Sequence, residues 1–80
     1  MYDVKMPQWG MDMTEGTILK WLIEEGDRVE KGTPIAEIEI AKATNELESP
    51  VSGVVVKLVA AEEETVHIQG LLAIIDEDAS

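Results

Sequence analysis

Apolar and acidic residues alternate in two short segments on either side of Lys42. The residues concerned are Ala36, Glu37, Ile38, Glu39 and Ile40 before the lysine, and Asn45, Glu46, Leu47 and Glu48 after it. A repeat of two residues is the period of a half-buried β-strand, so the pattern predicts two strands. Lys42 would then lie at the tip of the hairpin that joins them.

The wider pattern repeats itself along the chain. Residues 16–38, moved forward by 37 positions, fall on residues 53–75 without a gap. The identical pairs are Gly16 and Gly53, Lys20 and Lys57, Glu25 and Glu62, Val29 and Val66, Ala36 and Ala73, and Ile38 and Ile75. The apolar positions between them also agree, which predicts two similar β-units related by a pseudo-twofold axis.

Each unit is predicted to contain strands separated by turns. Residues 17–23 and 54–59 are rich in β-branched and aliphatic side chains, which is typical of strands. Glycine and proline mark turns between such segments, and no segment has a clear helical period. We therefore expect an all-β domain over residues 1–76, a flattened barrel or sandwich of two four-stranded sheets, with residues 77–80 beginning a linker.

The second unit differs from the first at its turns. Glu63 stands at the position of Gly26, and Gln69 stands at that of Gly32. Glycine at such positions usually supplies a positive φ without steric cost. Glu63 and Gln69 must therefore either adopt a positive φ or form a different turn. At the second of these turns, Gly70 follows Gln69 directly and is placed to supply the glycine.

Composition narrows the function classes. A chain of 80 residues suits one domain with a compact core and leaves little room for a deep active-site cleft. The net charge of −11 disfavours nucleic acid and anionic lipid, and it either favours a basic docking partner or only keeps the protein soluble. The sequence has no cysteine for a disulfide or a thiolate metal site, no apolar run long enough to span a membrane and no signal-peptide pattern at its start.

Lys42 is the main candidate for chemistry. It is one of only six basic residues, and its neighbours Ala41 and Ala43 are small, so at a hairpin tip its amine would be open to another enzyme. That environment suggests a point of covalent cofactor attachment, and the ordinary alternative is a solvated turn lysine. The acidic residues on both sides would either steer a basic partner or form the solvated face of two strands.

Other polar candidates are weaker. His67 is the only histidine and has no serine or carboxylate at relay spacing, so a surface strand or turn position is favoured over a catalytic or ligand role. The carboxylates of Glu62, Glu63 and Glu64 are consecutive and would point apart, which favours a charged turn over a metal site.

Four large apolar residues outside the repeat pattern are candidates for packing or binding roles. Trp9 is a candidate for a recognition loop, and Met11 and Met13 would pack beside the hairpin or against a partner. Met6 is expected to fill the core, and Trp21, on an apolar strand inside the first unit, is expected to pack in or against it.

Several stretches resemble the biotinyl/lipoyl attachment domain family over nearly the whole chain. Residues 6–16, with the pair Trp9-Gly10, resemble the opening of lipoyl domains in acyltransferases of 2-oxo acid and acetoin dehydrogenase complexes. Trp21 with residues 24–32 resembles the next stretch of the lipoyl-domain sequence pattern. Residues 46–53 resemble the strand that follows the modified hairpin in these domains.

The residues beside Lys42 separate the two branches of that family. Glu39 and Ala43 match the lipoyl pattern, whereas Ile40 and Ala41 stand where that pattern has threonine and aspartate. Biotin carriers typically place methionine on both sides of the lysine, and neither neighbour is methionine here. The resemblance therefore favours lipoyl over biotin.

The resemblance implies a carrier domain and not an enzyme. Lys42, flanked by Glu39, Ala41 and Ala43, would hold lipoic acid as an amide and pass acyl groups and reducing equivalents between active sites. The implied partners are a thiamine-diphosphate decarboxylase, an acyltransferase core, a flavoprotein dihydrolipoyl dehydrogenase and a lipoate-attaching enzyme. The isolated domain would be a monomer in the bacterial cytoplasm, or in the mitochondrial matrix of a eukaryote. The alternatives are a biotin carrier domain of a carboxylase and an unmodified β-scaffold or adaptor.

Overall fold

The computed structural model describes residues 1–77 and contains eight strands. They are β1 (Tyr2–Lys5), β2 (Glu15–Trp21), β3 (Arg28–Val29), β4 (Pro34–Ile40), β5 (Ala43–Glu48), β6 (Gly53–Leu58), β7 (Thr65–His67) and β8 (Leu71–Asp76). The described part of the chain has no helix, so the all-β expectation is confirmed. The last strand ends at Asp76, and three of the four residues expected to begin a linker, 78–80, lie outside the described residues.

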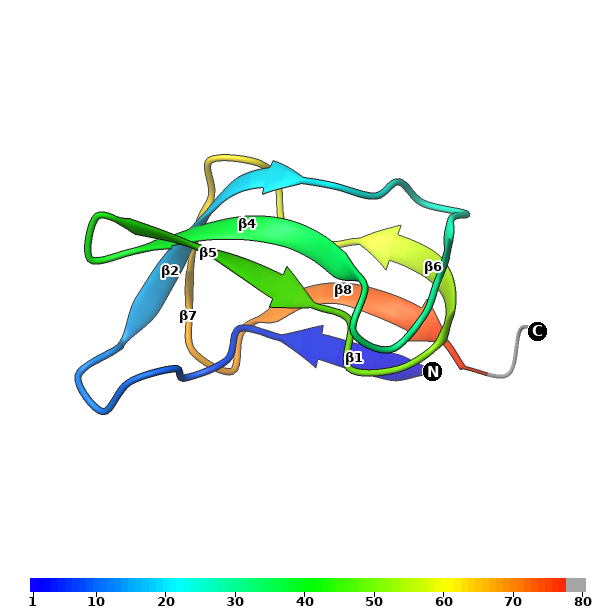
Figure 1. Cartoon of the computed structure of the whole chain (residues 1–80), viewed down its shortest axis with the longest axis horizontal. Coiled ribbons are helices and arrows are strands. Elements are labelled where there is room, and N and C mark those ends of the chain that lie inside the picture. Colours follow the sequence, from blue (N-terminus) through cyan, green and yellow to red (C-terminus); the bar gives the residue numbers. More distant parts are fainter. Residues whose placement is uncertain (78–80) are drawn as a thin grey trace.

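The strands form two antiparallel sheets, in the orders β1-β8-β6-β3 and β5-β4-β2-β7 (Figure 1). The internal repeat appears in their registers. In the second sheet Thr17 pairs with Glu39, and in the first sheet the residues 37 positions later, Val54 and Asp76, pair in the same way. Both sheets also carry an irregularity at the equivalent place, between Ile18 and Lys20 and between Val55 and Lys57. The predicted pair of four-stranded sheets and its duplication are therefore confirmed.

The core lies between the two sheets and is built from their inward residues. Ile18 and Ile38, on the neighbouring strands β2 and β4, are fully buried, and so is Ile75, the repeat equivalent of Ile38. Met6 is also fully buried, as expected. Trp21 is partly buried against the core, and its indole N–H donates to the carbonyl oxygen of Ala60 at 2.8 Å.

Steric contact explains two of the identities in the repeat. A Cβ on Gly16 would come within 2.9 Å of the Cγ2 of Ile38, and a Cβ on Gly53 would come within 2.9 Å of the Cγ2 of Ile75. Contacts below 3.0 Å require something to move. Each glycine therefore lets an isoleucine of the neighbouring strand in the same sheet pack against the backbone.

The turns of the two units share one conformation despite their different residues. Gly26 and Gly32 have a φ of 94°, and their equivalents Glu63 and Gln69 both have a φ of 69°. The hydrogen bonds are also equivalent, because the N–H of Gly32 donates to Ser49 at 2.9 Å and that of Gln69 donates to Met6 at 2.9 Å. Of the two outcomes expected for Glu63 and Gln69, the positive φ is therefore the one adopted, and Gly70 does not take over this role.

The first unit has a longer loop than the second. Val4 pairs with Ala73, and Leu47 pairs with Ala36. Because Ala36 and Ala73 are equivalent in the repeat, Val4 and Leu47 are equivalent as well. They are 43 positions apart, whereas Gly16 and Gly53 are 37 positions apart. The difference, 43 less 37, means that the connection from Val4 to Gly16, which contains the N-terminal loop between β1 and β2 (residues 6–14), is six residues longer than the connection from Leu47 to Gly53. Figure 1 shows this loop projecting at the same end of the molecule as the β4–β5 hairpin.

Candidate functional site

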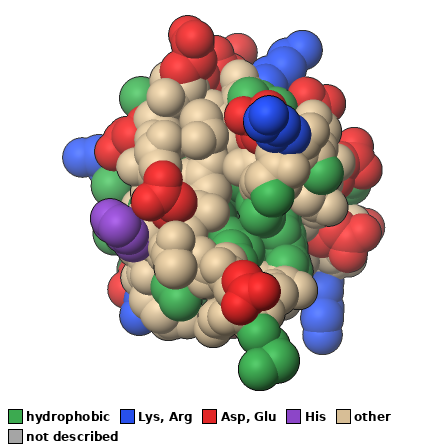
Figure 2. All heavy atoms as spheres, turned by 90° about the vertical axis from the view of Figure 1, so that its left-hand side faces the viewer, with side chains coloured by type: hydrophobic (Ala, Val, Ile, Leu, Met, Phe, Trp, Pro, Cys, Tyr) green, Lys and Arg blue, Asp and Glu red, His purple; other side chains and the backbone are tan. Residues whose placement is uncertain are grey.

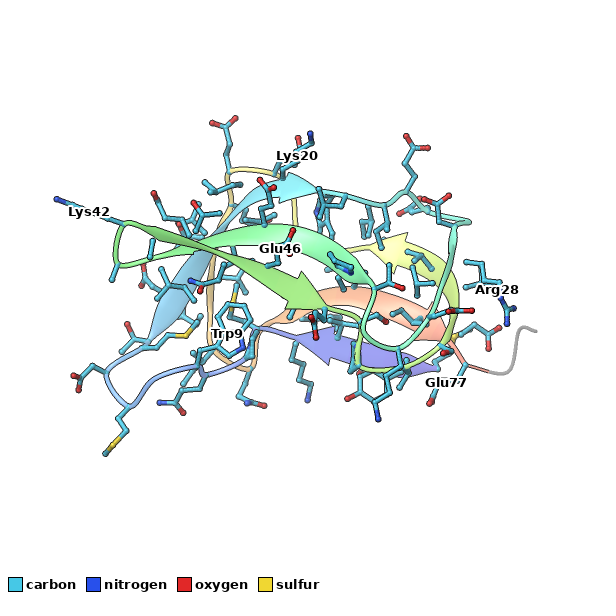
Figure 3. All side chains as sticks on the ribbon, viewed as in Figure 1. Trp9, Lys20, Arg28, Lys42, Glu46 and Glu77 are labelled. Carbon is cyan, nitrogen blue, oxygen red and sulfur yellow. The ribbon has the colours of Figure 1, made fainter. Side chains whose placement is uncertain are left out.

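Lys42 lies at the tip of the β4–β5 hairpin, as the alternating pattern predicts. Strand β4 ends at Ile40, β5 begins at Ala43, and these two residues pair across the hairpin. Ala41 and Lys42 form the two-residue turn, and both have positive φ, 51° and 68°. Positive φ at both central residues is the feature of a type I′ turn, whose twist matches that of the flanking strands. Figure 3 shows the lysine side chain pointing away from the body of the domain.

The hairpin gives Lys42 a rigid base. Ala36 and Ile38 on β4 are fully buried, and β4 pairs with β2 on one side and β5 on the other. Beyond these buried residues the hairpin projects from the sandwich (Figure 1), and the flanking residues Glu39, Ala41 and Ala43 are all exposed. The arrangement holds the backbone of Lys42 in place and leaves the approach to its amine open.

The N-terminal loop faces the hairpin across a hollow. Met13 is buried, its sulfur accepts a hydrogen bond from the backbone N–H of Trp9 at 3.3 Å, and its own N–H donates to Gly10 at 3.1 Å. These contacts hold the loop in a compact turn beside β4 and β5. The expected place of Met13 beside the hairpin agrees with this packing.

The space between loop and hairpin, named here the tip hollow, has a volume of about 510 Å³. Its apolar lining comes from both sides and consists of Trp9, Met11, Met13, Ile40 and Ala41. Figure 2 shows hydrophobic side chains gathered in a depression on the face that carries the hairpin tip. The sequence pattern singled out Trp9 and the methionines but did not predict the hollow, because its shape depends on how the longer loop folds.

Acidic side chains line the outer face of the second sheet. Glu37 stands directly opposite Glu46 on β5 and opposite Lys20 on β2. Like charges that face each other across strands are destabilising, and the lysine on the other side of Glu37 offsets part of that repulsion.

The weaker candidates have structural roles. His67 is exposed on β7, opposite Glu15, which agrees with the expected surface strand position. Glu62 accepts a hydrogen bond from the N–H of Trp21 at 2.9 Å, and Glu64 accepts one from the N–H of Ala61 at 2.8 Å. Within residues 1–77 no group of three or more histidine or acidic side chains is arranged to hold a metal ion. No helix long and apolar enough to cross a membrane occurs there either.

The match to a known protein family decides how the hairpin is interpreted. The family model described as biotin-requiring enzyme, the biotin and lipoyl attachment family, matches residues 2–75. The chain belongs to this biotinyl/lipoyl family. Its solved relatives include the lipoyl domain of the 2-oxoglutarate dehydrogenase complex from Azotobacter vinelandii, with a TM-score of 0.78 and 28% identity over 96% of this chain and 98% of that one. The biotinyl/lipoyl resemblance is thus confirmed for fold and family.

Curated relatives of this biotinyl/lipoyl domain are acyltransferase components. The component of the acetoin cleaving system of Pseudomonas putida is 39% identical over 77 residues, which cover 96% of this chain and 21% of the relative. The acetyltransferase component of the pyruvate dehydrogenase complex of Corynebacterium glutamicum is 43% identical over 74 residues, 92% of this chain and 11% of the relative. The chain therefore spans about a fifth of the first relative and about a tenth of the second.

Proposed function

We propose that this biotinyl/lipoyl domain is a swinging-arm carrier that holds lipoic acid as an amide on Lys42. The observation that supports it most strongly is the position of Lys42, alone at the tip of a rigid hairpin in a fold similar to a solved lipoyl domain. The similarity to acyltransferase components of acetoin and pyruvate systems supports the same role. The domain would serve as a substrate for other enzymes and not as a catalyst.

The residues at the tip fit such a group. An attaching enzyme must reach the Nζ of Lys42, and the exposed positions of Ala41 and Ala43 leave that approach open because their side chains are small. When bound, lipoic acid supplies a dithiolane ring that can accept an acyl group together with electrons, so the protein itself needs no acid, base or nucleophile. The contribution of the chain is to present the arm and to keep it tethered near successive active sites.

A biotin carrier is the second candidate within the same family. Its support is the family itself, which includes both cofactors. Against it stand the alanines on both sides of Lys42 and the acyltransferase relatives. An unmodified scaffold or adaptor is the third candidate, and its support is the replacement of the usual Thr-Asp pair by Ile40 and Ala41.

The partners follow from the proposed role and from charge. A lipoate-attaching enzyme, a thiamine-diphosphate decarboxylase, an acyltransferase core and a flavoprotein dihydrolipoyl dehydrogenase would each meet the hairpin in turn. With a net charge of −11, the domain suits partners whose docking surfaces are basic, and we expect association to weaken with salt. Nucleic acid and membranes are not among the proposed partners. We place the protein in the cytoplasm of a bacterium or the mitochondrial matrix of a eukaryote.

The folded carrier unit is proposed to comprise residues 1–76. Strand β8 ends at Asp76, and the family model ends one residue earlier, at residue 75. Residues 77–80 would begin the linker to the rest of an acyltransferase component. The isolated unit is proposed to be a monomer.

Attachment can be tested with purified enzymes. The domain is incubated with a lipoate-attaching enzyme, ATP and lipoate, and in parallel with a biotin-attaching enzyme and biotin, and the adducts are mapped by peptide mass spectrometry. We expect lipoate on Lys42 and none on the exposed Lys31 or Lys57. Lys42→Arg serves as the matched control, because it keeps the charge and removes the acylated amine. Lipoate on another lysine, or biotin on Lys42, would contradict the proposal.

A further inference from the structure

The N-terminal loop exposes apolar side chains that its own packing does not require. Met11 is 96% exposed and Trp9 is 46% exposed, although the loop is held by Met13 beneath them. The equivalent connection, from Leu47 to Gly53, is six residues shorter than the one from Val4 to Gly16, 43 less 37, so the fold closes at that end without such an extension. Exposed apolar side chains that rim a concave surface are typical of a ligand-binding groove.

The tip hollow is adjacent to the attachment point. Ala41, the residue before Lys42 in the turn, forms part of its lining, as does Ile40 at the end of β4. An arm attached to Lys42 is therefore tethered at the rim of the hollow, and its carbon chain is free to fold back over Ala41. A tethered ligand has a high effective concentration, so even weak contacts are enough to populate a bound state.

The chemistry of the lining suits the end of that arm. Trp9, Met11 and Met13 present an aromatic ring and two thioethers to the hollow, whose lining also includes the polar residues Asp12, Thr14, Glu15 and Asn45. A dithiolane ring is neutral, apolar and rich in polarisable sulfur, and sulfur makes favourable contacts with aromatic rings and with flexible methionine side chains. A volume of about 510 Å³ lies within the range of small-molecule sites and exceeds what a five-membered ring and its short chain require.

We propose that the tip hollow is a resting site for the dithiolane ring on its own domain. This inference rests on the proposed function, since it assumes a lipoyl arm on Lys42. In the free domain the ring lies against Trp9 and Met11, shielded from water and from small thiols, and a partner enzyme draws it out by binding the ring better than the hollow does. The loop thus stores the arm between reactions.

The test places the dithiolane on the hairpin without an attaching enzyme. The chain has no cysteine, so Lys42→Cys offers a single thiol that can be alkylated with a haloacetamide carrying the dithiolane on a chain of matched length. A second reagent with the same chain but no ring is the control. Amide chemical shifts of the two adducts are compared by NMR, and the rate at which a water-soluble phosphine reduces the ring is measured.

We expect the ring, and not the control chain, to shift the amide signals of residues 9–14 and the indole signal of Trp9. We also expect reduction to become several-fold faster when Trp9→Ser and Met11→Ser are introduced together, and to be unchanged by Val59→Ser, which removes an apolar side chain of similar exposure elsewhere. Shifts confined to the turn, with equal reduction rates in all variants, would overturn the inference and leave the hollow as a surface for a partner. A failure of enzymatic lipoylation would instead count against the proposed function, because this experiment does not depend on it.

Discussion

Glu62 and Trp21 are joined across the two units by a hydrogen bond of 2.9 Å, in which the backbone N–H of Trp21 donates to the Oε2 of Glu62. The repeat equivalents, Glu25 and Leu58, are joined in the same way at 3.0 Å. In both cases the carboxylate accepts a hydrogen bond from the N–H of the last residue of a strand, which is Trp21 in β2 and Leu58 in β6. The conserved place of a glutamate in the two units therefore has a structural cause.

Removing either carboxylate is expected to lower the stability of the domain. Glu62→Ala and Glu25→Ala should each reduce the free energy of unfolding by about 1 kcal/mol, because a backbone N–H loses a charged acceptor. Glu30→Ala provides the control for the loss of one exposed negative charge from a chain of net charge −11. Urea unfolding followed by fluorescence measures the difference. Equal stabilities for Glu62→Ala and Glu30→Ala would show that the hydrogen bond contributes nothing.

The turns of the second unit are expected to gain stability from glycine. Glu63 and Gln69 hold a φ of 69°, which is costly for residues that carry a Cβ. Glu63→Gly and Gln69→Gly should each raise the free energy of unfolding by about 0.5–1 kcal/mol, since relief of strain outweighs the added freedom of the unfolded chain. Gly26→Ala and Gly32→Ala, at the equivalent turns, should lower it. A loss of stability in both glycine variants would mean that the side chains of Glu63 and Gln69 contribute more than their backbone costs.

Gly53 is expected to tolerate substitution less well than Gly16. A Cβ on Gly53 would approach the backbone of Asp76, with the carbonyl carbon at 2.9 Å, whereas a Cβ on Gly16 meets only side-chain atoms. Gly53→Ala should therefore cost about 3 kcal/mol, and Gly16→Ala about 1 kcal/mol, because side chains yield more readily than backbone. Thermal and urea unfolding of both variants would decide this order, and the reverse order would contradict the steric account.

Ala41 is expected to affect decarboxylase recognition more than lipoate attachment. An attaching enzyme needs the presented lysine, which the hairpin supplies with or without a neighbouring carboxylate. A decarboxylase must also position the ring, and one exposed charge contact is worth about 0.2–1 kcal/mol. Ala41→Asp should therefore leave attachment nearly unchanged and raise the rate of reductive acylation by a pyruvate-type decarboxylase several-fold.

The structure adds a second reason to expect that Ala41→Asp is tolerated. The φ of 51° at this position is one that aspartate adopts more readily than alanine. The comparison should use fully lipoylated proteins at low and moderate salt, since a charge contact weakens with ionic strength. Equal acylation rates would make Ala41 a neutral variation, and a loss of attachment would mean that the attaching enzyme reads this residue.

The strands and the hairpin tip could be predicted because they follow from local periodicity. Alternation on both sides of Lys42 determines which residues face the core, and a strand pair with so short a connection leaves little freedom in where the turn falls. The duplication was visible for the same reason, since the residues that recur, such as Gly16 and Gly53, are required by contacts that recur.

Other features could not be predicted because they depend on tertiary contacts. Ala41 and Lys42 lack the Asn-Gly or Asp-Gly signal of a type I′ turn, so their positive φ is imposed by the strands they connect. The tip hollow depends on the packing of Met13 and its hydrogen bond with Trp9, which no periodic pattern encodes. The difference in loop length between the units would have pointed to it, but the equivalence of Val4 and Leu47 that reveals this difference comes from strand pairing.

Whether Lys42 carries lipoic acid can be measured directly from the mass of the protein purified from its native host. The intact mass gives the modification, and peptide mapping gives its position. We expect a single lipoyl group, located on Lys42 and absent when Lys42→Arg is expressed in the same host. A biotinyl group on Lys42, a lipoyl group on another lysine, or an unmodified chain under conditions in which the host lipoylates its other carrier domains would contradict the claim.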